Sequence, residues 1–165
     1  MCNAATITRT SRACLAASAL VILSVSLAEA AYGPRTKIGN TYQQTSTTKS
    51  SDGSTEGSCN GGNTCYVLFQ LPPAQKPLIV QTVSCRVLVN AGGLDYAWLR
   101  SRKASVIPLR RTYLAPVKTT NGNHWIVSSP VMHLIESGER PVVFIANSAG
   151  ATWSIVECTI SGQLQ

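Results

Sequence analysis

Aromatic and arginine side chains alternate along one short segment of this chain. Every second position within residues 94–102 carries one of them: Tyr96, Trp98, Arg100 and Arg102. Because successive side chains of a β-strand point to opposite faces, this spacing would place all four on one face of an extended segment. Aromatic rings beside arginines on a flat face can stack against sugar rings and pair with acidic groups. The segment is therefore a candidate binding surface.

A second interpretation of the same segment makes Tyr96 and Trp98 core residues. Large aromatic side chains are buried more often than displayed, so core burial is the favoured interpretation of these two rings. Under it, the arginines only mark the point at which the strand reaches solvent. Lys103, Arg110 and Arg111 follow closely in the sequence and extend a basic cluster. We therefore include Arg110 and Arg111 with the four alternating residues as candidate binding residues.

Side chains suited to acid–base catalysis or metal binding are scarce. The chain has two histidines, His124 and His133, and seven acidic residues, too few to favour glycoside hydrolysis. It has no G-x-S-x-G nucleophile motif and no glycine-rich phosphate motif. His133 and Glu136 form an H-x-x-E pair, but side chains three residues apart in a strand face opposite sides. We therefore predict histidines that are exposed or at the rim of the fold, no catalytic residue, no metal site and no cofactor.

The cysteines predict disulfide bonds. Four of the six cysteines, Cys59, Cys65, Cys85 and Cys158, follow the first thirty residues, which have the pattern of a removable secretory signal. An even number of cysteines in an exported chain indicates cross-links. Alternation along two expected strands places Cys85 and Cys158 on inward, apolar faces. We therefore predict a bridge between these two. Cys59 and Cys65 would then close the small loop between them, since their spacing does not match a zinc site.

The first thirty residues have the pattern of a secretory signal peptide. Two arginines precede an uncharged, mostly apolar run over residues 13–28, and an A-x-A cleavage site ends at Ala30. The run is shorter than the roughly 20 residues that cross a bilayer, so a permanent anchor is disfavoured. We predict cleavage after Ala30 and an exported protein, periplasmic or secreted, with no membrane span after cleavage.

The sequence from Cys65 onward is typical of an all-β protein. Short runs rich in Val, Ile and aromatic residues are separated by Gly, Pro and Asn, and no window shows helical periodicity. The expected strands cover residues 64–71, 78–90, 94–102, 105–117, 123–129, 131–136, 141–147 and 152–163. About eight strands at this spacing predict an antiparallel β-sandwich stapled by disulfides, with a jelly roll left open as its topology.

Residues 31–63 differ in composition from the rest. Ser, Thr, Gly and Asn dominate, so we expect a flexible leader or a long surface loop, with a short edge strand around residues 37–45 left open. The expected organisation is thus a signal peptide over residues 1–30, this polar segment over 31–63 and a β-sandwich domain over 64–165.

Three short segments resemble small secreted bacterial β-sandwich proteins of unassigned function. They are Thr82-Val83-Ser84-Cys85-Arg86-Val87, Gly138-Glu139-Arg140-Pro141 and Glu157-Cys158-Thr159-Ile160-Ser161-Gly162. The resemblance covers about three fifths of the chain, from Cys65 to Gly162. It implies a compact exported sandwich with a disulfide, and it transfers no catalytic residue.

The charge balance is basic, with a net charge of +7. Such a balance attracts anionic partners, although nucleic acid is disfavoured because the chain carries no nucleic-acid-binding motif. We predict a non-enzymatic exported protein that binds an acidic or neutral glycan, or an envelope protein, at or outside the cell envelope. The alternatives are a structural or inhibitor-like protein and, less favoured, a hydrolase with an unfamiliar site.

Overall fold

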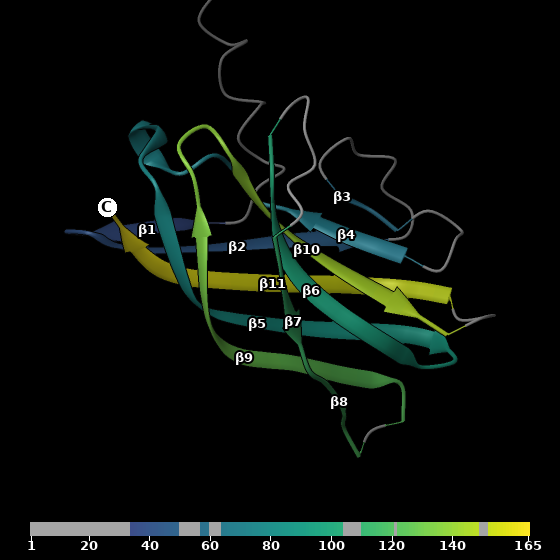
Figure 1. Ribbon diagram of the computed structural model, residues 1–165. Helices are drawn as coiled ribbons and strands as arrows, with labels where there is room; N and C mark the ends of the chain where they lie inside the picture. Colours follow the sequence, from purple (N-terminus) through teal and green to yellow (C-terminus); the bar gives the residue numbers. More distant parts are fainter. Residues whose placement is uncertain (1–33, 50–56, 60–63, 104–109, 121, 149–151) are drawn as a thin grey trace, which may run out of the picture. The chain divides into compact units, whose positions relative to one another are not determined.

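The computed structural model describes residues 34–49, 57–59, 64–103, 110–120, 122–148 and 152–165. These residues form eleven β-strands and one short 3-10 turn, η1 (Pro73–Gln75), and the strands belong to two antiparallel sheets (Figure 1). In this part of the chain, no helix has the length and apolar character needed to cross a membrane.

Sheet A has six strands in the order β1-β2-β11-β5-β9-β8. Its strands are β1 (Arg35–Ile38), β2 (Thr41–Lys49), β5 (Leu78–Ala91), β8 (Pro116–Lys118), β9 (His124–Ile135) and β11 (Thr152–Leu164). Sheet B has five strands in the order β3-β4-β10-β6-β7. Its strands are β3 (Gly57–Ser58), β4 (Thr64–Leu68), β6 (Leu94–Arg102), β7 (Arg111–Leu114) and β10 (Arg140–Asn147).

Eight of these strands form a jelly roll. In chain order, strands 1 to 8 are β2, β4, β5, β6, β7, β9, β10 and β11, and the two sheets then read 1-8-3-6 and 2-7-4-5. The first strand pairs with the last, the second with the seventh, the third with the sixth and the fourth with the fifth. This is the double-sheet arrangement of a jelly roll. The predicted antiparallel sandwich is confirmed, and its topology is the one that the sequence left open.

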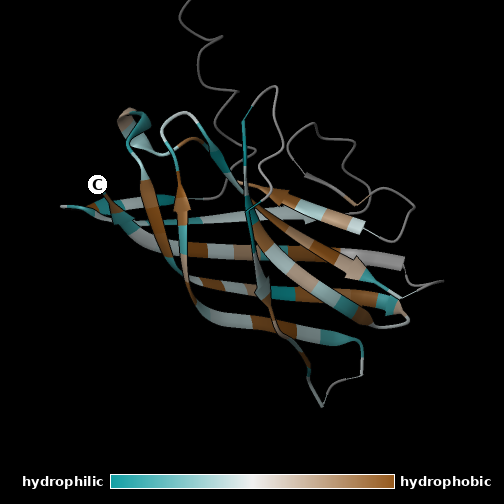
Figure 2. Ribbon diagram, in the orientation of Figure 1, coloured by the Kyte–Doolittle hydropathy of each residue, from teal (hydrophilic) through white to brown (hydrophobic). Residues whose placement is uncertain are grey.

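The core lies between the sheets, and Figure 2 shows apolar residues along strands of both. Cys85 of β5 and Cys158 of β11 lie opposite each other on inward faces, with Cα atoms 4.0 Å apart, and form a disulfide. Cys59 and Cys65 form the second disulfide. Both predicted pairings are confirmed, and such cross-links are typical of an oxidising, extracytoplasmic environment.

The described residues of the polar segment 31–63 form strands, where composition favoured a leader or a surface loop. They form β1, β2 and β3, which includes the strand left open around residues 37–45, and β2 is the second strand of sheet A, between β1 and β11. The sandwich therefore begins well before residue 64, and the expected domain boundary at that residue is wrong.

Hydrogen bonds explain how so polar a strand as β2 enters the core. Its inward side chains Tyr42, Gln44 and Ser46 are buried. The Tyr42 hydroxyl donates to Oε1 of Gln44 at 2.6 Å, and the N–H of Gln70 donates to the same oxygen at 3.2 Å. The Ser46 hydroxyl donates to the carbonyl oxygen of Leu68 at 2.8 Å. Burial also raises the pKa of Tyr42 to about 12, so its hydroxyl stays protonated.

Two expected strand boundaries are also corrected. The segments 123–129 and 131–136 form one strand, β9, which continues through Pro130. Proline is tolerated there because β8 pairs with β9 only as far as Val127, so Pro130 has no hydrogen-bonding partner in β8. The expected strand over 105–117 is instead represented by β7 in sheet B and the start of β8 in sheet A. Residues 104–109 of that expected strand lie outside the described residues.

Candidate binding surface on sheet B

Strand β6 places the alternating aromatic and arginine residues on the outer face of sheet B. The intervening residues Ala97 and Leu99 are fully buried and belong to the core cluster, which does not include Trp98. Tyr96 is 45% exposed, and Arg102 is exposed as well. The favoured interpretation of the sequence, in which both rings are core residues, is therefore wrong for Tyr96. Trp98 is buried as that interpretation expected, but its neighbours are on the outer face and it lies outside the core cluster. The alternation itself predicted the correct common face.

The strand register brings one aromatic residue from each of four strands into line. Phe144 of β10 lies opposite both Tyr66 of β4 and Trp98 of β6, and Tyr113 of β7 lies opposite Trp98. We call these four residues the aromatic row. The Trp98 and Phe144 ring centroids are 5.3 Å apart, and Tyr96 stacks on Trp98 at 4.9 Å. These neighbours explain why Trp98 is only 8% exposed on an outer face.

A shallow depression of about 250 Å³ lies at the β7 end of the aromatic row. It is lined by Tyr96, Trp98, Arg111 and Tyr113. The Tyr113 side chain is 71% exposed, so its ring is accessible to a ligand. The indole Nε1 of Trp98 is buried without a hydrogen-bond partner among the described residues. The depression is small for a whole ligand and suits one ring of a longer one.

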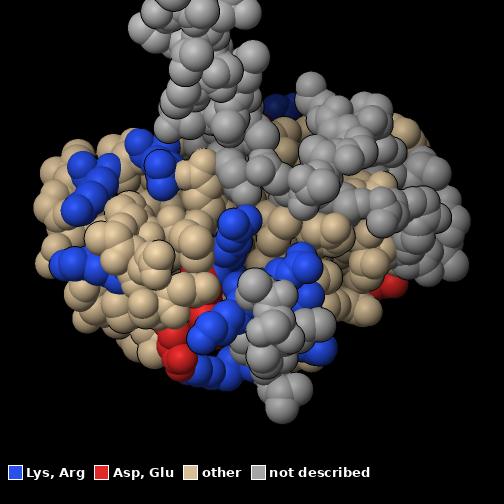
Figure 3. All heavy atoms as spheres, turned by 90° about the horizontal axis from the view of Figure 1, so that it is seen from above, with Lys and Arg blue, Asp and Glu red and all other residues tan. Residues whose placement is uncertain are grey.

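Arginines occupy the next positions along the same face. Arg100 of β6 lies opposite Arg111 of β7, and Arg102 lies opposite Arg140 of β10. We call these four residues the arginine cluster. Burial, followed by the charges of Arg111 and Arg102, lowers the pKa of Arg100. Figure 3, seen from above, shows basic side chains gathered near the middle of one face of the molecule.

The guanidinium groups of two of these arginines lie over aromatic rings. The guanidinium carbon Cζ of Arg100 lies 3.7 Å from the centroid of the Phe144 ring, and that of Arg111 lies 5.3 Å from the centroid of the Trp98 ring. Cation–π attraction favours both placements and orders the long side chains. The aromatic row and the arginine cluster therefore form one continuous surface.

Arg110, the remaining arginine predicted from the sequence, has a different role. Its guanidinium donates to the carboxylate of Glu136, and this bond raises the pKa of Arg110. The Glu139 carboxylate in turn accepts a hydrogen bond from the N–H of Glu136 at 3.0 Å. Arg110 is thus held by a carboxylate next to the turn after β9, and the structure does not bring it into the aromatic row.

The two histidines do not lie together. His133 is 5% exposed, with its Nδ1 2.8 Å from the Thr112 hydroxyl, and burial lowers its pKa. The expectation that both histidines are exposed or at the rim is therefore wrong for His133, which is buried. About 30 Å of extended strand separates it from His124, so the pair cannot share one catalytic centre. The described residues contain no group of three or more His, Cys, Asp or Glu side chains that could hold a metal ion.

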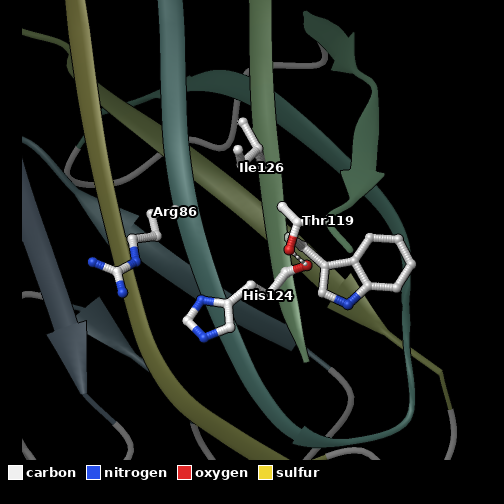
Figure 4. A pocket seen from close by; sticks show the side chains of 5 residues that line it. Arg86, Thr119, His124 and Ile126 are labelled. Atoms are coloured by element: carbon white, nitrogen blue, oxygen red, sulfur yellow. Dashed lines mark hydrogen bonds between the residues drawn. The ribbon is translucent and has the colours of Figure 1, made fainter. Parts of the chain in front are cut away.

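His124 borders a second depression, of about 260 Å³, on sheet A. Figure 4 shows Arg86, Thr119, His124 and Ile126 around it, and the Thr119 hydroxyl donates to the carbonyl oxygen of His124 at 3.1 Å. Trp125 completes the lining. This depression has one aromatic residue and no row of rings, which distinguishes it from the surface on sheet B.

Sequence reasoning missed the residues that other strands contribute to the surface. Tyr66 is in β4, Tyr113 in β7, and Phe144 and Arg140 are in β10, and none of these strands carries the extended alternation of β6. Alternation could have assigned each to an outer face, but only the strand register brings them beside Trp98 and Arg102.

Comparisons with protein-family models, with curated proteins and with solved structures find no match for this chain. Its class is defined by its own structure: a disulfide-linked jelly roll whose sheet B carries aromatic rings and arginines on its outer face. Function is therefore inferred from the chemistry of that face.

Proposed function

We propose that this chain is an exported, non-enzymatic protein that binds a glycan at or outside the cell envelope through the outer face of sheet B. The aromatic row, with an accessible depression at its β7 end, is the observation that carries the proposal. The apolar C–H face of a sugar packs against an aromatic ring, and its hydroxyl groups accept hydrogen bonds from arginine. Both kinds of group line the same depression.

Export is supported by two independent features. The first thirty residues combine two arginines, an apolar run and an A-x-A site, as secretory signal peptides do. The two disulfides fit a compartment in which cysteines oxidise. A periplasmic or secreted protein meets envelope and extracellular polysaccharides, which makes a glycan a reasonable partner.

The experiment is a glycan array with the secreted chain at low salt, followed by calorimetry on the strongest hits. We expect Tyr113→Ala to weaken binding about fivefold, because stacking on an aromatic ring contributes on the order of 1 kcal/mol and the ring borders the depression. Its stability should change little, because the side chain is exposed. Val117→Ala, at an exposed apolar residue of β8 in sheet A, is the matched control. Absence of any glycan ligand, or equal binding by Tyr113→Ala and the control, would contradict the proposal.

Protein interaction is the second candidate, and apolar residues on the outer face of β9 favour it. Ile126, Met132 and Leu134 share that face and are exposed, Met132 by 85%. Exposed apolar side chains grouped on one face are typical of protein contacts. A partner captured from envelope extracts that is lost with Met132→Ser/Leu134→Ser, but kept with Tyr113→Ala, would favour this function.

A further inference from the structure

We propose that Arg100 and Arg111 form an anion subsite beside the aromatic row, so that the glycan bound there carries an acidic substituent. The subsite itself follows from the two arginines, whereas the identity of its carrier as a glycan rests on the function proposed above. The acidic group is a carboxylate, sulfate or phosphate attached to the sugar, since all three offer oxygen pairs to a guanidinium.

Two positive charges face each other across neighbouring strands of sheet B. Arg100 and Arg111 lie directly opposite each other on neighbouring antiparallel strands, and Arg102 lies on the same face. Like charges in this position destabilise a sheet, and the partial burial of Arg100 weakens its screening by water. An anion between the two guanidinium groups would turn this repulsion into attraction.

Aromatic rings order both guanidinium groups before any ligand binds. Arg100 lies over the ring of Phe144 and Arg111 over that of Trp98. A guanidinium stacked on a ring keeps its N–H groups in its own plane, free to meet an anion edge-on. The subsite thus offers donors whose ordering precedes ligand binding.

The guanidinium groups lie next to the depression. That of Arg111 is 5.3 Å from the centroid of the Trp98 ring, and that of Arg100 lies over Phe144, whose ring centroid is 5.3 Å from that of Trp98. A sugar seated in the depression would therefore bring an acidic substituent on its ring to the arginines. Arg111 lines the depression and lies opposite Arg100, so it belongs both to the depression and to the anion subsite.

The test compares two matched probes by calorimetry at constant ionic strength. One is an oligogalacturonate of fixed length, and the other is the same oligomer with its carboxyl groups reduced to alcohols. We expect the native chain to bind the acidic oligomer at least about tenfold more tightly, as charge-assisted hydrogen bonds imply. Arg100→Gln/Arg111→Gln should remove this preference. Arg100→Gln alone leaves the lining of the depression intact, so it should weaken the preference for the acidic oligomer and leave affinity for the reduced oligomer within about twofold. Arg86→Gln/Lys118→Gln removes the same charge from sheet A and should keep the preference.

A second readout separates the subsite from the glycan proposal. Inorganic sulfate, titrated against chloride at equal ionic strength, should raise the thermal midpoint of the native chain and of Arg86→Gln/Lys118→Gln more than that of Arg100→Gln/Arg111→Gln. This result without binding of either oligomer would support the anion subsite and contradict a glycan carrier of this kind. Equal binding of both oligomers with no arginine-dependent sulfate effect would overturn the subsite and leave the glycan function intact. No oligomer binding and no sulfate effect would overturn the subsite, and together with a glycan array that yields no ligand it would overturn both proposals.

Discussion

The outer faces of the two sheets follow the same alternation but differ in chemistry. On sheet A, one row across four strands consists entirely of hydroxyl residues, Thr45, Thr159, Ser84 and Ser128. On sheet B, the corresponding feature is the aromatic row, flanked by arginines. The hydroxyls of Thr45 and Thr159 lie 2.8 Å apart and bond to each other. Hydrogen bonds within sheet A thus satisfy some of the polar groups on its outer face.

The charges of the two faces show the same difference. Arg86 on sheet A lies opposite Glu157, a pair of opposite charges that favours strand pairing. Arg100 on sheet B lies opposite Arg111, a pair that disfavours it. These pairs favour the stability of sheet A, whereas sheet B carries repulsion that an anionic ligand would relieve.

The largest effect is expected at Gly162 of β11, in sheet A. A Cβ atom there would overlap the carbonyl group of Ile79 and lie 2.9 Å from the Cα of Val80, both backbone groups of the neighbouring strand. We expect Gly162→Val to lower the free energy of unfolding by about 4 kcal/mol or more, or to prevent folding. Denaturant titration would measure the loss, with Ser161→Ala as the control. Native-like stability of Gly162→Val would contradict this close approach of strands.

The disulfides come next. By loop-closure entropy, loss of the Cys85–Cys158 bridge, with 73 residues of separation, should cost roughly 4 kcal/mol. Loss of Cys59–Cys65, with a separation of 6, should cost roughly 2 kcal/mol. Paired Cys→Ala variants under denaturant would rank the two. Because the first bridge lies in sheet A, the folded fraction of that variant should keep its glycan affinity. Loss of affinity in the folded fraction would contradict the assignment of glycan binding to sheet B.

Charge reversal should separate stability from binding. Arg111→Glu places a carboxylate opposite Arg100, so we expect stability to rise by about 0.5 kcal/mol while binding of acidic glycans is lost. Glu157→Arg on sheet A creates a like-charge pair with Arg86 and should lower stability by a similar amount without changing binding. Thermal unfolding would measure the stability of each variant, and calorimetry would measure its affinity for acidic glycans. Destabilisation by Arg111→Glu would contradict a destabilising repulsion between Arg100 and Arg111.

The smallest effect is a pH dependence from His133. Burial, with the charge of Arg110, lowers its pKa in the folded state, while Glu139 acts in the opposite direction. Since the folded state favours the neutral ring, its contribution to stability is complete above the ordinary pKa of about 6.5 and is lost as the pH falls through the lowered folded pKa. His133→Gln should therefore flatten the decline in stability below pH 6.5. An unchanged pH profile in that variant would assign the decline to other groups.

The sequence predicted those parts of the molecule that follow from local alternation. Cys85 and Cys158 each lie at apolar positions of their strands, and the structure confirms their bridge. Alternation also predicted that Tyr96, Trp98, Arg100 and Arg102 share a face, although burial statistics for large aromatics favoured the wrong side for the two rings.

The remaining features depend on long-range pairing that no local pattern contains. The inward residues of β2 are polar, and what permits their burial is bonding to Leu68 and Gln70, more than twenty residues away. Likewise, Tyr66 and Phe144 join Trp98 only through the register of β4 and β10. Composition is a weak guide where hydrogen bonds from distant strands offset the cost of burying polar groups.

The central claim, that sheet B and not sheet A is the binding face, is tested most directly by NMR. Amide and arginine side-chain resonances of the isotope-labelled chain would be followed during titration with the acidic oligogalacturonate. We predict shifts concentrated in β6, β7 and β10, largest at Arg100, Arg111 and Tyr113, with Thr45, Thr159 and Ser84 unaffected. Shifts concentrated on the hydroxyl row of sheet A, or around the depression at His124, would contradict the account.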